Sequence, residues 1–137
     1  MPNILRIVVP VLAAFVAFAV LVAGRAAAED RVVLQTRPGV TQPILFQPAA
    51  SPVASVVLFP GGVGVIAVTG GNFLLRVRGE FAARGISVAV IDAPSDRSTD
   101  SIEYRASADA AQDLAAVVNF LKSKASVPVW LVGTSNG

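Results

Sequence analysis

The sequence contains no cysteine and no histidine among its 137 residues. The absence of cysteine excludes disulfide bonds, lipid attachment through a cysteine and metal sites built from thiolates. The absence of histidine also removes the side chain that most often binds zinc or haem iron, so we expect no metal and no other cofactor. A histidine base, which a serine nucleophile commonly needs, is missing as well.

The sequence also lacks a surplus of either charge once its first residues are set aside. Eleven basic and nine acidic residues give a formal net charge of +2, but Arg6 and Arg25 lie in the apolar N-terminal stretch. Residues 29–137 therefore carry nine basic and nine acidic side chains and are neutral. This balance does not favour binding to a phosphate backbone, so we expect no nucleic-acid partner.

The one long hydrophobic run is at the N-terminus. Residues 7–24 are almost wholly apolar, follow a short segment with one arginine, and precede three alanines at positions 26–28. This layout is typical of a secretory signal peptide, so we assign residues 1–28 to a leader cleaved after Ala28. The alternative is a retained membrane anchor, for which such a run is near the lower limit of about 17 residues. We expect a periplasmic or secreted protein that meets the membrane only through an uncleaved leader.

Strand-like and helix-like segments alternate after the leader. Short apolar runs predict strands, and apolar residues three or four apart predict helices. The expected strands are residues 31–37, 41–47, 54–59, 86–91 and 127–132, and the expected helices are residues 72–84 and 106–124. The first two strands are close enough to form a hairpin, and Pro43 indicates that the second is an edge strand. The order predicts an α/β domain: a mostly parallel sheet with a leading hairpin and helices on both faces.

The last five residues, Gly133-Thr134-Ser135-Asn136-Gly137, have the pattern G-x-S-x-G. This is the pattern of a nucleophile elbow, in which a serine occupies a sharp turn after a strand with its hydroxyl exposed. The apolar run at residues 127–132 is typical of the buried strand that should precede the turn. The alternative is an ordinary Gly/Ser turn without chemistry.

A second glycine-rich segment, Phe59-Pro60-Gly61-Gly62-Val63-Gly64, follows the third expected strand. A serine nucleophile needs N–H groups aimed at the negative oxygen of the tetrahedral intermediate, and glycines let a backbone approach the substrate closely. The candidate donors are the backbone N–H groups of Asn136 and of Gly62 or Val63. The alternative is a turn that needs glycine only for its backbone angles.

These two motifs make residues 29–137 resemble the N-terminal half of the α/β-hydrolase family, up to the elbow. The resemblance implies a serine hydrolase for a small-molecule ester or amide, with Ser135 as nucleophile and an oxyanion hole made by the N–H groups of Asn136 and of Gly62 or Val63. The family's usual histidine before the loop glycines is Pro60 here. The family's acid and histidine follow the elbow, so we expect a partial domain from a longer enzyme, without measurable turnover alone.

Two other functions fit parts of the sequence. One is a non-catalytic binding protein on the same fold. The other is a dinucleotide-binding domain, because Gly62-x-Gly64-x-x-Ala67 matches a relaxed phosphate-binding fingerprint and Asp92 would then bind a ribose. In that motif a helix should begin on the glycines, whereas residues 65–71 continue as an apolar loop. Asp92 is more simply a strand-end residue that caps the next loop.

Four carboxylates cluster after the fourth expected strand, at Asp92, Asp96, Asp100 and Glu103. Calcium binds several oxygens, but this spacing matches no calcium loop. We interpret the segment as a solvated polar loop at the carboxyl edge of the sheet, where residues 95–101 border the substrate cleft and influence specificity.

Overall fold

The computed structural model describes residues 28–66 and 71–137. The predicted leader therefore lies outside the described residues, except for Ala28, as does Ala67 of the dinucleotide fingerprint. The described elements are β1 (Asp30–Arg37), β2 (Val40–Gln47), β3 (Ala54–Phe59), α2 (Phe73–Ala83), β4 (Ile86–Ile91), α3 (Ile102–Arg105), α4 (Ala108–Lys124) and β5 (Val129–Gly133). Their bounds agree with the sequence prediction to within two residues, except that α3 was expected to be loop.

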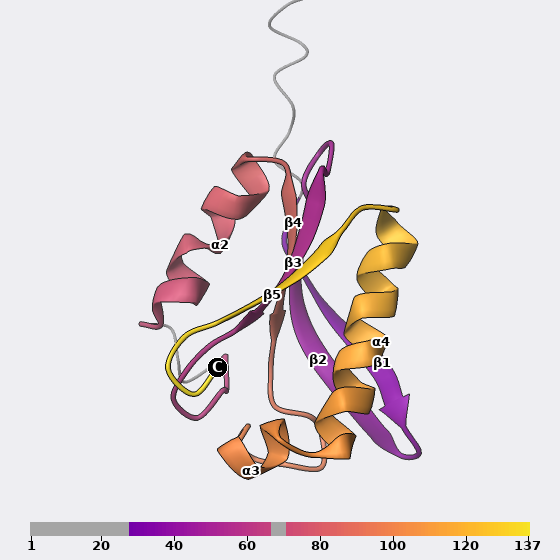
Figure 1. The fold of residues 1–137 in the computed structure, drawn as a ribbon, viewed down its shortest axis with the longest axis vertical. Coiled ribbons are helices and arrows are strands. Elements are labelled where there is room, and N and C mark those ends of the chain that lie inside the picture. The colour runs from indigo at the N-terminus through magenta and orange to yellow at the C-terminus, as the bar shows by residue number, and fades with distance from the viewer. Residues whose placement is uncertain (1–27, 67–70) are drawn as a thin grey trace, which may run out of the picture.

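The five strands form one open mixed sheet in the order β1-β2-β4-β3-β5 (Figure 1). The hairpin strands β1 and β2 are antiparallel, and β2 is also antiparallel to β4. The remaining pairs, β3 with β4 and β3 with β5, are parallel. The prediction of a mostly parallel sheet is therefore wrong, because the hairpin strands pair with each other and with β4 in antiparallel orientation.

The prediction that Pro43 marks an edge strand is also wrong, since β2 lies between β1 and β4. The register that pairs Ile44 with Ile91 places Pro43 opposite Asp92, just beyond the end of β4. The Asp92 N–H donates to the Pro43 carbonyl over 3.1 Å, but proline has no N–H to return. The Gln42 side chain supplies the missing donor, with its Nε2 2.5 Å from the Asp92 carbonyl oxygen. Proline is thus tolerated inside the sheet because a neighbouring side chain completes the ladder.

Helices cover both faces of the sheet, as predicted (Figure 1). The side chains of β3 alternate between two apolar clusters, as the two-residue period of a strand requires. Val57 packs on one face with Val117 and Leu121 of α4. Val56 and Leu58 pack on the other face with the buried leucines of α2. The central strands β3 and β4 are therefore buried on both faces, which explains their unbroken apolar sequences.

Polar side chains cap the helices at their N-terminal ends. Asn72 accepts a hydrogen bond from the Leu74 N–H at the start of α2, and Ser107 accepts one from the Ala110 N–H at the start of α4. Ser101 caps α3 in the same way, a signal that the sequence prediction overlooked. Within residues 28–66 and 71–137, no helix combines the length and hydropathy needed to cross a membrane.

Candidate functional site

The segment after β5 is a tight turn, and Ser135 lies within it. The Gly137 N–H donates to the Thr134 carbonyl over 2.9 Å and closes the turn. Ser135 has φ of 57°, the only positive φ of a non-glycine residue in the described part of the chain. Its side chain is on the exposed surface at the carboxyl end of β5. The turn therefore presents a serine in a left-handed backbone conformation that serine rarely adopts.

The glycines on either side of this turn are required by its close backbone packing. A Cβ atom at Gly133 would overlap the Gly137 backbone, and one at Gly137 would overlap the Phe59 carbonyl oxygen. The overlaps involve backbone atoms, which cannot move aside as a flexible side chain does. The G-x-S-x-G spacing thus has a steric cause in this structure.

The glycine loop after β3 lies against the serine turn. A Cβ atom at Gly61 would be 2.6 Å from the Thr134 carbonyl oxygen and 3.0 Å from the Ser135 Cβ. The next two residues, Gly62 and Val63, are exposed, and Gly62 has φ of 76°. The structure therefore brings the two predicted motifs together, with the predicted donors one and two residues beyond the contact.

Arg105 joins the loop to the turn, and the sequence analysis did not identify it. Its guanidinium donates to the Pro60 carbonyl over 2.9 Å and to the Asn136 carbonyl. It also pairs with Asp100 at 2.9 Å. No sequence signal marks this contact, because the carbonyl partners are 45 and 31 residues away and a lone arginine near polar residues is typical of a solvated surface.

The interpretation of the carboxylates after β4 as a solvated cluster is wrong for two of the four, since Asp96 and Glu103 are exposed and the other two are not. Asp92 and Asp100 are buried, at 6% and 3% exposure. Each is buried because it has fixed partners, Arg105 in the case of Asp100. Among the described residues, no group of three potential ligands is arranged to hold a metal ion.

Asp92 caps the loop that follows β3 and the one that follows β4. Its Oδ1 accepts from the N–H groups of Ile66 and Ala93, both over 3.0 Å, and its Oδ2 from Arg31 over 3.2 Å. Both oxygens are therefore occupied by the protein. A helix does not begin on the loop glycines either, since α2 begins at Phe73. The geometry is unlike that of a dinucleotide site, where the helix starts at the glycines and the carboxylate is free for a ribose.

A second buried ionic group lies next to the site and includes Tyr104, which follows Asp100 and precedes Arg105 in the chain. Arg37 of β1 donates two hydrogen bonds to the fully buried Asp113 of α4, over 2.9 and 2.8 Å. The Tyr104 hydroxyl donates to the same carboxylate over 2.6 Å. Burial alone would raise the pKa of Asp113, but hydrogen bonds from Arg37, Thr36 and Tyr104 outweigh it and hold this pKa below its usual range. Burial and the Asp113 carboxylate raise the pKa of Tyr104.

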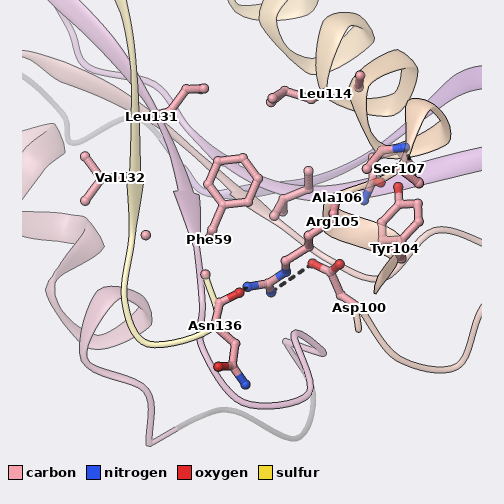
Figure 2. Close-up of a pocket in the computed structure, with 16 residues that line it drawn as sticks. Phe59, Asp100, Tyr104, Arg105, Ala106, Ser107, Leu114, Leu131, Val132 and Asn136 are labelled. Atoms are coloured by element: carbon pink, nitrogen blue, oxygen red, sulfur yellow. Dashed lines mark hydrogen bonds and ion pairs between the residues drawn. The ribbon is translucent and has the colours of Figure 1, made fainter. Parts of the chain in front are cut away.

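A cavity of about 460 Å³ lies beside the turn, on the α4 face of the sheet (Figure 2). Its walls are largely apolar and include Phe59, Leu114 and Leu131. Arg105 and Asn136 line its polar end, where Figure 2 shows Arg105 between Asp100 and the turn. Ser135 does not line this cavity, so the cavity is adjacent to the serine rather than around it.

Solved structures with a similar fold include α/β hydrolases. An α/β serine hydrolase without a lid from Xanthomonas campestris matches with a TM-score of 0.53 and 17% identity, over 80% of this chain and 51% of its own. The chain has the α/β-hydrolase fold. The esterase Pf2001 of Pyrococcus furiosus matches with a TM-score of 0.59 and 18% identity, over 81% of this chain and 43% of its own.

DcsB, solved in complex with a substrate analogue, matches with a TM-score of 0.61 and 22% identity, over 80% of this chain and 38% of its own. The chain thus spans about half or less of the length of the three structures named here. No protein-family model matches the sequence, and no curated protein matches it. The likeness is therefore one of fold, at identities too low to transfer a substrate.

Proposed function

We propose that this chain carries the nucleophile of a serine hydrolase that cleaves a small-molecule ester or amide through an acyl-enzyme. The observation that carries the proposal is the conformation of Ser135, an exposed serine with φ of 57° at the end of β5 and against a glycine loop. A non-glycine residue in this conformation costs about 1–3 kcal/mol, and such strain is concentrated at functional sites. Similar folds in a serine hydrolase and an esterase support the same chemistry.

In the proposed reaction, the Ser135 Oγ attacks the substrate carbonyl carbon and its proton passes to a base. The carbonyl oxygen becomes negative and accepts from the Asn136 N–H and from an N–H of Gly62 or Val63. The tetrahedral intermediate then expels the leaving alcohol or amine, which receives the proton from the base. Water repeats the sequence on the acyl-enzyme, releasing the acid and restoring the serine.

The base must come from elsewhere, because these 137 residues contain no histidine. We propose that the histidine and its acidic partner follow the elbow in a longer parent protein, in the order usual for this fold. Residues 1–28 would direct that parent to the periplasm or the outside of the cell. The substrate and its pocket then depend mainly on residues after the elbow.

A fluorophosphonate probe on the full-length parent tests the proposal. The probe should label the folded protein, and peptide mapping should place the adduct on Ser135. Ser135→Ala is the variant that should lose labelling, and Ser123→Ala is the matched control, an exposed serine of α4 that should leave labelling unchanged. A folded parent that does not label at Ser135 would favour a binding protein on the same fold.

A further inference from the structure

We infer that Arg105 is a positioning residue that holds the loop after β3 in place for catalysis, an inference that rests on the proposed hydrolase function. The loop between Pro60 and Gly64 would supply one oxyanion donor. Such a donor works only if its N–H is already fixed where the negative charge develops. The structure assigns that task to the ion pair of Arg105 with Asp100.

The first support is that the two residues of the pair hold the two ends of the loop, one through its side chain and the other through its backbone. At one end, Arg105 Nη2 donates to the Pro60 carbonyl over 2.9 Å. At the other end, the Asp100 N–H donates to the Val63 carbonyl over 2.9 Å. The exposed Gly62 lies between these two anchors. The segment that carries the donors is therefore held at one end by the Arg105 guanidinium and at the other by the backbone N–H of its ion-pair partner Asp100.

The second support is the close contact of the pair with Gly64. This glycine has φ of 65°, and a Cβ atom there would be 2.8 Å from Arg105 Nη2, 3.0 Å from Asp100 Oδ2, and would overlap the Asp100 Cβ. The loop backbone thus lies directly on the ion pair. A shift of the guanidinium would move the loop with it.

The third support is that Arg105 contacts the serine turn at the same time. Its Nη1 donates to the carbonyl of Asn136, the residue whose N–H is the other proposed donor. One guanidinium therefore joins the peptide groups on both sides of the proposed oxyanion hole. Its planar, rigid group of five donors suits this task, whereas a lysine ammonium could not keep the same spacing between its partners.

The pair is not an efficient stabilising contact, which favours a role beyond folding. The side chains are 14% and 4% exposed, so both charges have lost most of their water. Within the described part of the chain, Arg105 Nε and Asp100 Oδ1 are buried and have no hydrogen-bond partner. Buried pairs with incomplete hydrogen bonding are often matched or surpassed in stability by apolar side chains.

Steady-state kinetics of the full-length parent with a p-nitrophenyl ester test the inference. Arg105→Gln should lower kcat about 100-fold, the effect expected of misplaced catalytic groups, and change KM much less. Inhibition by phenylboronic acid, whose serine adduct places an oxygen in the hole, should weaken in parallel with kcat. If Arg105 served only folding, a variant of unchanged thermal stability would not lose kcat and boronate affinity together.

Arg84→Gln is the matched control, because the exposed guanidinium of Arg84 pairs with Glu80 of α2 instead of with the loop or the turn. It should leave kcat within twofold of wild type. If Arg105→Gln does not fold, Arg105→Lys decides: it keeps the charge and should still lose kcat and boronate affinity together. Wild-type parent that fails to label at Ser135 would overturn the hydrolase proposal itself. If the wild type is labelled and active, and a folded Arg105 variant has unimpaired kcat, the positioning role alone is overturned.

Discussion

Ser135 adopts a left-handed backbone conformation that only glycine accepts without strain. Its neighbours make the conformation unavoidable, since Gly133 and Gly137 are packed against backbone atoms on both sides of the turn. The strain is therefore a local property of one residue. It has a measurable consequence for stability.

We expect Ser135→Gly to be about 1 kcal/mol more stable than Ser135→Ala, because glycine relieves the left-handed conformation while alanine retains it. In the full-length parent, both variants should be inactive. Urea unfolding of the two variants measures the difference. At the helical position Ser123 the order should invert, with glycine about 1 kcal/mol less stable than alanine. Equal stability of the two Ser135 variants would contradict backbone strain at this residue.

Asp113 is the buried carboxylate on which Arg37 and Tyr104 converge. Asp113→Asn should destabilise the fold by about 1.5–3 kcal/mol at neutral pH, because a neutral amide replaces the buried carboxylate that accepts from Arg37, while Asp96 and Asp109 still compensate part of the Arg37 charge. The pKa of Asp113 is lowered by folding, so its contribution is complete above the unfolded value of about 4 and is lost as pH falls through the folded value. The gap between wild type and variant should therefore narrow in acid.

Chemical denaturation from pH 7 down to pH 3 measures this gap. The control is Asp109→Asn, because Asp109 also pairs with Arg37 but is 47% exposed. It should cost less than about 1 kcal/mol, as exposed pairs do. A pH-independent gap for Asp113→Asn would contradict ionisation of Asp113 as the source of the stability.

At the scale of elements, the end of the β2–β4 ladder depends on a side chain instead of a backbone donor. Gln42 is fully buried and donates to the Asp92 carbonyl because Pro43 has no N–H. This contact also fixes Asp92, which caps the loop leading from β3. The stability of the junction between the hairpin and the rest of the sheet therefore depends on the Gln42 side chain.

Gln42→Leu should cost about 1–3 kcal/mol, because it leaves the Asp92 carbonyl without its donor. In a Pro43→Val background the new backbone N–H can take that place, so the same change should cost about 1 kcal/mol less. Equilibrium unfolding of the four proteins of this double-mutant cycle measures the coupling. Costs that add to within about 0.5 kcal/mol would show that the two donors do not substitute for one another.

For the whole molecule, the notable surface is the edge formed by β5. Among the described residues β5 pairs only with β3, and its Trp130 and Leu131 are 65% and 54% exposed. An apolar edge strand with free N–H and C=O groups is a template for pairing with another chain. The opposite edge, β1, is more polar in sequence.

We expect the 137-residue chain to self-associate when purified. Trp130→Lys should shift it toward monomer, because a charge on an edge strand opposes pairing. Sizing chromatography over a range of protein concentrations measures the change. Val53→Lys is the control, since Val53 is 69% exposed but lies outside the strands. A wild-type chain that stays monomeric throughout would contradict the expectation.

The sequence by itself determined the described strands, the helices α2 and α4, and the two motifs. Strands and helices could be located because buried strands are continuous apolar runs and helices repeat every three or four residues. The serine turn and the glycine loop could be located because their glycines meet steric demands that are local in sequence. The order of the strands in the sheet was harder to predict from the sequence. Proline at position 43 indicated an edge strand, and only the position of Gln42 against Asp92 shows why it is not one.

Tertiary structure alone decided how the two motifs are joined. Arg105 and Asp100 looked like solvated polar residues, since nothing within a few positions of either one indicates a partner, and for Asp92 only the cap of the next loop could be expected. Folding brings carbonyl groups from 31 and 45 residues away to Arg105, and it buries the carboxylates with their donors. The physical reason is that apolar periodicity and turn chemistry act over a few residues, whereas the pairing of a buried charge depends on which distant segments the sheet order makes neighbours.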